Sequence, residues 1–293
     1  MTSVAESSTS LRNELKKIVG ESKANAISVA VLDLESGFRF SLAGDRWFHA
    51  ASTIKVAVLL AIFRAADEGR LRLDDPLHVR NRFLSAADGS PFRLSPTSDG
   101  MPELYRAIGR TVKISALAEG MIIASSNLAT NLLLDFVGVD YARQVLRDAQ
   151  ISGVELRRGV QDENAHERGI DNEVTADGLL TLLCAVRGDF LKQQSREEII
   201  RILLAQRFNS MIPAGLPPHA TVAHKTGEIS TACHDAGIVY LPEREPYIVV
   251  ILTEFDTEKD GRYQTLAGIS NLIYRSVTGR ASKNNESSNI SRN

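Results

Sequence analysis

The sequence predicts an α+β fold, and three observations support that class. Strand patterns occur near the N-terminus, at 26–34 and 38–42, and near the C-terminus, at 221–225, 234–241 and 247–253. The stretch between them has the apolar spacing of helices. N- and C-terminal strands that are separated by helices can pair into one antiparallel sheet, with helices on its faces and a helical lobe beside it.

The first elements follow from short-range patterns. Apolar residues at helical spacing predict an amphipathic helix over 10–19. Glu35-Ser36-Gly37 predicts the turn of a hairpin between the first two strands. A helix is then expected from Ser52 to about Glu68, where Gly69 can end it.

Residues 80–102 are polar and interrupted by glycine and proline, which predicts a long surface loop. Helical patterns cover 114–137, 140–149, 175–186 and 196–206, with a charged irregular segment at 156–172 and a closing helix at 263–277. We expect one structural domain over 1–278, made of two lobes with the helical lobe at about 50–205, and a disordered tail over 279–293.

Composition excludes several kinds of partner. The chain has 293 residues and a formal net charge of −2 with both signs dispersed, so neither nucleic acid nor a membrane surface is expected as a partner. We expect a monomer. The polar N-terminus lacks a secretory leader, which predicts a cytoplasmic protein, or a periplasmic or secreted one if a leader has been removed. Cys184 and Cys233 are expected to be buried thiols, and a disulfide remains open for a secreted protein.

The first chemical motif is Ser52-Thr53-Ile54-Lys55, at the start of the most apolar helix. Positions i and i+3 share a helix face, so the hydroxyl and the amine can meet. Partial desolvation disfavours the charged amine and makes it a better base for the serine. This motif alone is weak, because a lysine that only reaches to the surface from a core helix gives the same pattern.

Two further motifs follow along the chain. Ser125-Ser126-Asn127 interrupts an apolar helical stretch and fits both a helix N-cap and a ligand-facing turn. His224-Lys225-Thr226-Gly227 ends a strand, where the lysine can attract a carboxylate and the glycine allows close backbone approach. An edge strand with a protective lysine would give the same pattern.

In the order S-x-x-K, S-x-N, K-T-G, these motifs resemble those of the class A β-lactamases and penicillin-binding proteins, over about residues 26–278. The resemblance implies that Ser52 is the nucleophile, that Lys55 helps remove its proton, and that Ser125 passes a proton to the leaving nitrogen. It implies that Asn127 holds the substrate's amide side chain. The remaining implied roles are a carboxylate site at Lys225 and Thr226, beside Gly227, and an oxyanion hole from the backbone N–H groups of Ser52 and Glu228.

The sequence departs from that pattern in two places. Ser126 replaces the middle aspartate of the second motif. Class A enzymes carry a water-activating glutamate four residues before an asparagine, and counting back from Asn164 places Val160 there. Either a shifted carboxylate such as Asp162 or Glu163 replaces that base, or deacylation is slow. The acids of this segment, Glu167 included, could also simply solvate a surface loop.

Three functions remain open from the sequence. The first is β-lactam hydrolysis through an acyl-enzyme, and the second is a related peptidase, esterase or transacylase with slow deacylation. The third is a non-hydrolytic protein that binds such ligands. We expect a small-molecule substrate, a β-lactam, amide or ester bearing a carboxylate, and no cofactor. His234-Asp235 is expected to be a structural pair. No metal is expected, because metal-ligand spacing is absent from the histidines, which are His49, His78, His166, His219, His224 and His234.

Overall fold

A computed structural model describes residues 4–256 and 261–290 of the chain. The helices are α1 (Val4–Glu21), α2 (Lys55–Asp67), α3 (Ile114–Ile123), α4 (Asn127–Val137), α5 (Val139–Asp148), α6 (Glu163–Glu167), α7 (Ala176–Arg187), α8 (Gln193–Leu204) and α9 (Arg262–Ile290). The strands are β1 (Ala24–Asp33), β2 (Arg39–Leu42), β3 (Phe48–His49), β4 (Pro76–His78), β5 (Phe83–Leu84), β6 (Pro91–Phe92), β7 (Thr111–Lys113), β8 (Val154–Glu155), β9 (Glu173–Val174), β10 (Thr221–Ile229), β11 (Ala232–Tyr240) and β12 (Tyr247–Phe255). Short 3₁₀ turns are η1 (Ala51–Ile54), η2 (Pro96–Ser98), η3 (Pro102–Ala107) and η4 (Pro213–Gly215).

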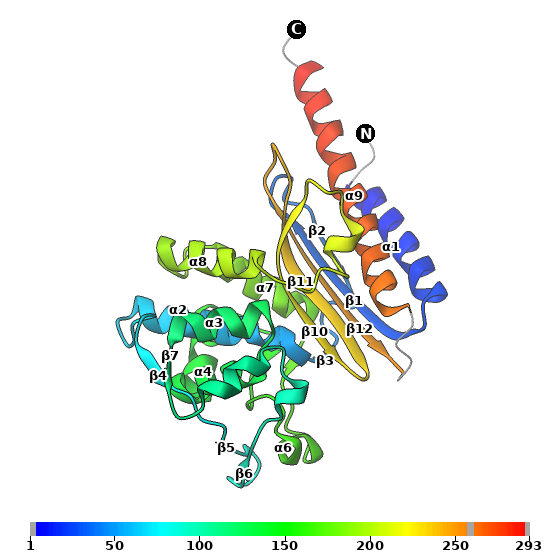
Figure 1. Cartoon of the computed structure of the whole chain (residues 1–293). Helices are drawn as coiled ribbons and strands as arrows, with labels where there is room; N and C mark the ends of the chain where they lie inside the picture. Colours follow the sequence, from blue (N-terminus) through cyan, green and yellow to red (C-terminus); the bar gives the residue numbers. More distant parts are fainter. Residues whose placement is uncertain (1–3, 257–260, 291–293) are drawn as a thin grey trace. The chain divides into compact units, whose positions relative to one another are not determined.

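The main sheet joins the two ends of the chain. Its five strands run in the order β10-β11-β12-β1-β2, and the pairs within it are antiparallel (Figure 1). The register places Val29 opposite Ile251, so the N-terminal hairpin continues the C-terminal meander. The predicted α+β class and the pairing of N- and C-terminal strands are therefore confirmed.

Helices α1 and α9 lie side by side against one face of this sheet (Figure 1). Alternate residues of the central strands, such as Val29 and Val31 on β1, belong to the same buried cluster as Leu15 and Ile269 from the two helices. A strand places successive side chains on opposite faces, which is why every second residue contributes to this layer. The layer anchors β10, the strand that carries the third motif.

The chain divides into two compact units. One holds residues 1–48, 175–180 and 208–293, and the other holds residues 49–174 and 181–207. The two-lobed domain at 1–278 and the disordered tail at 279–293 stay predictions. Helix α9 extends to Ile290, and residues 291–293 lie outside the described part of the chain.

The second unit is built around α2. Its apolar run from Val56 to Phe63 is buried, and α3, α4, α5 and α8 pack against it. A helix that is apolar all round needs such a cover on every side.

Within the described residues, Cys184 and Cys233 form no disulfide, and no helix is both long enough and apolar enough to cross a membrane.

The local structure differs from the sequence prediction in two segments of this unit. The helix expected from Ser52 is an α-helix only from Lys55, because η1 comes first. The helix expected over 114–137 breaks between Ile123 and Asn127. The predicted loop at 80–102 contains the short hairpin β5–β6 and the turn η2.

Candidate active site

Ser52 lies in a tight turn at the entrance to α2. Ala51, directly before it, has a left-handed backbone with φ of 45°, which is unfavourable for a residue with a β-carbon. Thr53 stabilises the turn, because both its N–H and its hydroxyl donate to the carbonyl oxygen of Ala50, at 3.1 and 2.5 Å. Ser52 is half-buried, so its hydroxyl sits on a constrained turn at the margin of the core.

Lys55 is fully buried, and its amine connects the first two motifs. Its Nζ donates to the carbonyl oxygen of Ser125 at 2.7 Å, to Ser125 Oγ at 3.1 Å and to Asn127 Oδ1 at 2.8 Å. An amine removed from water needs such partners, because unpaired buried charge is costly. The structure thus brings together Lys55, Ser125 and Asn127, with Ser52 one helical turn before the lysine.

The break between α3 and α4 presents the second motif. Ser125 has a left-handed backbone with φ of 56°, which ends one helix and redirects the chain into the next. Ser126 then caps α4, since its Oγ accepts from the N–H of Ala129 at 3.2 Å. The residue that replaces the family's aspartate therefore has a clear role in helix capping.

Asp99 is the second cap of α4, and it was not anticipated from the sequence. Its buried carboxylate accepts from the N–H groups of Asn127 and Leu128, at 2.9 and 2.8 Å, and from the hydroxyl of Tyr105 at 3.2 Å. A carboxylate at a helix N-terminus satisfies otherwise unpaired N–H groups and interacts well with the helix dipole. One of the two caps of α4 thus comes from the segment predicted as a loop.

Gly100, the residue after Asp99, packs directly against the backbone of Ala124, and its replacement gives the first prediction. A β-carbon on Gly100 would lie 1.6 Å from the carbonyl oxygen of Ala124, a backbone atom that cannot swing away. We expect Gly100→Ala to lower the free energy of unfolding by about 3 kcal/mol or more, as measured by urea denaturation. Gly268→Ala is the matched control, because nothing lies within 4 Å of its added β-carbon. An unchanged midpoint in the Gly100 variant would contradict the close packing of residues 99–100 against Ala124.

The third motif lies on β10, in the unit that contains the main sheet. Lys225 is buried, and its Nζ donates to the carbonyl oxygen of Thr226 at 2.8 Å. Burial lowers the pKa of Lys225 to about 7, and the carboxylate of Asp235 raises it only in part. Thr226 and Gly227 are also buried, whereas Glu228 is exposed and accepts from the hydroxyl of Tyr263 at 2.7 Å.

Asp235 supports β10 through a different histidine from the one predicted. The sequence pairs it with His234, but adjacent strand residues point to opposite faces of a sheet. Asp235 instead contacts His224 Nδ1 at 2.8 Å, across the β10–β11 ladder, and accepts from the N–H of Ile212 at 3.0 Å. His234 Nδ1 accepts from the N–H of Thr253 at 3.1 Å.

The segment 156–172 forms a closed loop between β8 and β9. Arg158 is buried and pairs with Asp171 at 2.6 Å. Asn172 Oδ1 accepts from the N–H of Arg158 at 3.1 Å, and Asn172 Nδ2 donates to the Arg158 carbonyl oxygen at 2.9 Å. These contacts hold Arg158 next to Asp171 and Asn172, and we call this base of the loop its neck.

Val160 is fixed within this loop by its backbone. Asn131 Nδ2 donates to the Val160 carbonyl oxygen at 3.0 Å, and the N–H of Val160 donates to Asn131 Oδ1 at 2.8 Å. Asn131 lies on α4, one turn after Asn127, so the second motif and the loop share one helix. Asn131 was also missed from the sequence, although it stands in the same segment as the second motif.

The loop's acidic residues differ in their surroundings. Asp162 is buried, with Oδ1 accepting from the N–H of Ala165 at 3.1 Å and Oδ2 from the N–H of Ala86 at 2.8 Å. It therefore caps α6 and ties the loop to residue 86. Glu163 and Glu167 are exposed. Asn164 donates to Asp88 Oδ1 at 2.8 Å.

Solved structures share this fold over nearly the whole chain. An ancestral class A β-lactamase is 25% identical, with a TM-score of 0.79, over 90% of this chain and 99% of that one. A leucine-to-glutamate variant of PBP-A, in an acyl-enzyme complex with penicillin G, is 25% identical with a TM-score of 0.79 and covers 92% and 97% of the two chains.

Curated relatives point to the same class. β-Lactamase BRO-1 of Moraxella catarrhalis is 23% identical over 283 residues, which cover 90% of this chain and 84% of that protein. A β-lactamase of Streptomyces albus G is 26% identical over 260 residues, covering 86% and 80%. Fold and relatives define a class A β-lactamase-like serine hydrolase. The model of the β-lactamase enzyme family matches residues 10–277, and the chain belongs to that family.

Proposed function

We propose that this protein is a β-lactam-hydrolysing enzyme that acylates Ser52 and releases the acyl group slowly. The observation that carries the proposal is the buried amine of Lys55, bonded to Ser125 and Asn127 one helical turn after Ser52. Membership of the β-lactamase enzyme family supports the substrate class.

The acylation step uses the residues around Lys55. Ser52 Oγ attacks the lactam carbonyl carbon while its proton passes to Lys55 in the neutral form. A neutral amine has two N–H donors, which serve the carbonyl oxygen of Ser125 and Asn127 Oδ1, and one lone pair, which accepts the proton once the contact with Ser125 Oγ is released. Ser125, already bonded to Lys55, delivers a proton to the lactam nitrogen as the ring C–N bond breaks. Asn127 binds the amide side chain.

The remaining assignments concern charge on the substrate. The backbone N–H groups of Ser52 and Glu228 stabilise the oxyanion that develops on the carbonyl oxygen. Lys225 and Thr226 bind the substrate carboxylate, and Gly227 allows the ligand to approach the strand. We retain the expectation of a monomer that acts on a small carboxylate-bearing molecule.

Val160 favours a second candidate, a penicillin-binding-type peptidase, esterase or transacylase. Valine cannot activate water, and the Asn131 bonds hold the valine backbone in place. Asp162 caps α6, which leaves Glu163 as the more exposed substitute base. A non-hydrolytic binder is the third candidate and requires no acylation.

One paired experiment separates these candidates. Hydrolysis of a chromogenic cephalosporin and of a small neutral ester is followed with the same enzyme, and intact-protein mass spectrometry reports the acyl-enzyme. Cephalosporin turnover with a detectable adduct supports the proposal. Ester turnover alone favours the second candidate, and a protein that binds penicillin without any adduct contradicts acylation.

The lowered pKa of Lys225 gives a pH prediction. The amine carries its charge below a pKa of about 7 and loses it as the pH rises through that value. We therefore expect kcat/KM for a carboxylate-bearing cephalosporin to fall on the alkaline side, since kcat/KM reports the free enzyme. A neutral ester should keep its kcat/KM over the same range.

A variant tests the same assignment. Lys225→Ala should lower kcat/KM for the cephalosporin by about 10- to 100-fold, the worth of a charge-assisted hydrogen bond, and affect the ester much less. Lys113→Ala, at an exposed lysine, is the control. Equal losses for both substrates would show that Lys225 does not bind the carboxylate.

A further inference from the structure

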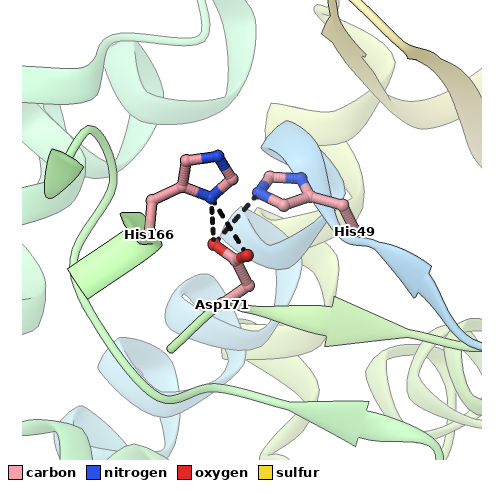
Figure 2. Close-up of side chains that lie close together, drawn as sticks. All are labelled: His49, His166 and Asp171. Atoms are coloured by element: carbon pink, nitrogen blue, oxygen red, sulfur yellow. Dashed lines mark hydrogen bonds and ion pairs between the residues drawn. The ribbon is translucent and has the colours of Figure 1, made fainter. Parts of the chain in front are cut away.

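Two histidines and one carboxylate meet beside the neck of the loop 156–172 (Figure 2). His166 Nδ1 lies 3.0 Å from both oxygens of Asp171, and His49 Nε2 lies 3.6 Å from Asp171 Oδ1. Asp171 also pairs with Arg158. His49 comes from β3, whereas His166 comes from α6, so the carboxylate joins segments far apart in sequence.

The other nitrogen of His49 contacts the nucleophile turn. His49 Nδ1 accepts a hydrogen bond at 3.1 Å from the backbone N–H of Ala51, the left-handed residue directly before Ser52. A nitrogen that accepts cannot carry a proton, so His49 is neutral with its proton on Nε2, the atom that faces Asp171. The histidine thus holds a strained residue that precedes the attacking hydroxyl.

A backbone hydrogen bond also joins the turn before Ser52 to the end of the loop 156–172. The N–H of Ala50 donates to the carbonyl oxygen of Asn172 at 2.8 Å, and Asn172 closes the neck together with Arg158. The turn before Ser52 is therefore connected to the end of the loop twice, by the hydrogen bond from Ala50 to Asn172 and by the 3.6 Å contact of His49 Nε2 with Asp171.

The same tautomer argues against a metal ion. A metal bound at His49 Nε2 would require the ring proton on Nδ1, where it would face the N–H of Ala51. The guanidinium of Arg158, 2.6 Å from Asp171, adds positive charge beside the place a cation would occupy. The cluster consequently fits a positioning role, in which His49 bonds Ala51 and lies against Asp171, better than a metal site.

We infer that His49 is a positioning residue, which holds the turn before Ser52 through Ala51 and connects it to the loop 156–172 through Asp171. This inference rests on the proposed function, because it concerns how fast Ser52 is acylated. His49 touches neither substrate nor the reacting atoms. It sets the direction of the Ser52 hydroxyl, and even a small misalignment of an attacking group lowers the rate of acylation strongly.

Protonation of His49 would undo the arrangement. A proton on Nδ1 replaces the acceptor with a donor, and the bond to Ala51 is lost. Burial lowers the pKa of His49 from the usual 6.5, and the nearby carboxylate of Asp171 raises it by a smaller amount. Arg158 and His166 lower this pKa, and Glu173 raises it. The neutral ring therefore predominates at neutral pH, and acylation slows only as the pH falls through this lowered pKa.

Three replacements of His49 separate its contact with Ala51 from its contact with Asp171. Asparagine places its Oδ1 where Nδ1 stands and can accept from Ala51, but it cannot titrate. Glutamine places its amide near Nε2 and can donate to Asp171 only, and leucine makes neither bond. We expect His49→Leu and His49→Gln to slow acylation by a fluorescent penicillin by about 10- to 100-fold.

The expected signature is rescue by asparagine. His49→Asn should recover most of the acylation rate and lose the acidic decline that the lowered pKa of His49 is expected to give the wild type. His166→Leu is the matched control, since His166 contacts Asp171 without touching Ala51. Thermal unfolding of each variant is measured alongside, so that a variant that fails to fold is distinguished from one that is misaligned.

Several outcomes would overturn the inference. Wild-type labelling rates in His49→Leu would do so, as would a His49→Asn variant as slow as the leucine variant. Zinc that stabilises the wild type against heat, but not His49→Asn or His166→Leu, would show a metal site instead. If the wild type is never labelled, the proposed function fails. Long-range ¹H–¹⁵N NMR then still decides the tautomer, and a proton on Nδ1 at neutral pH rejects the positioning role.

Discussion

Replacing Ser52 with alanine is expected to abolish covalent labelling by penicillins while leaving the protein folded. The proposed mechanism forms the acyl bond on Ser52 alone, and loss of a nucleophilic serine costs on the order of 10⁶ in kcat in a serine protease. Ser52 is half-buried, so removal of one oxygen should change the free energy of unfolding by less than about 1 kcal/mol.

The measurement is the mass of the intact protein after incubation with penicillin, together with urea denaturation of the same sample. Ser115→Ala, a half-buried helical serine of the same unit, serves as the control and should be labelled normally. Undiminished labelling of Ser52→Ala would reject the nucleophile assignment. Digestion of the adduct would then identify the acylated residue, with Ser125 examined first because it is bonded to Lys55.

The secondary structure and the chemical motifs could be predicted from the sequence, because both depend on local patterns of residues. Alternation and turn residues located the strands, and their position at the two ends of the chain predicted the antiparallel sheet that pairs β1 with β12. Motif order, through the family resemblance, assigned Lys55, Ser125 and Asn127 to one site, and the contacts of the Lys55 amine with the other two residues were found in the structure. For the motifs, the usable signal was polar residues in otherwise apolar segments.

Contacts between distant segments could not be predicted in this way. Asp99 caps α4 from 28 positions before Asn127, out of a stretch whose glycines and prolines indicated only a loop. The left-handed backbone of Ser125 breaks a segment whose apolar periodicity predicts a continuous helix. His49 contacts Asp171 across more than a hundred residues, and no metal-ligand or catalytic spacing marks either residue. Asp235 pairs with His224 because of strand register, a property of the assembled sheet.

Replacing Val160 with glutamate is expected to convert a slow enzyme into a faster one. In the wild type, the acyl-enzyme should accumulate, which gives a burst of product equal to the enzyme concentration and then a slow steady rate. Val160→Glu restores a carboxylate at the position where class A enzymes activate water. A positioned general base contributes about 10²- to 10⁴-fold, so the steady rate should rise within that range and the burst should disappear.

The fixed backbone makes this a clean substitution. Asn131 bonds both the N–H and the carbonyl oxygen of Val160, so the new side chain starts from an unchanged main chain. Val160→Gln is the matched control, since it has the same size and cannot accept the proton. Acylation rates should stay similar in the wild type and both variants, because Ser52 and Lys55 carry that step.

Rapid turnover of the wild type, without a burst, would contradict this prediction. A wild type that turns over rapidly without a burst must already possess a base, and Glu163→Gln should then create the burst. Asp162→Asn should mainly lower stability, because that carboxylate caps α6 and accepts from the N–H of Ala86. Rapid turnover that survives the replacement of Asp162, Glu163 and Glu167 alike would leave Lys55 as the group that activates the water. During acylation, Lys55 takes a proton from Ser52 and passes it to Ser125. Its amine is then neutral again and can accept a proton from the water.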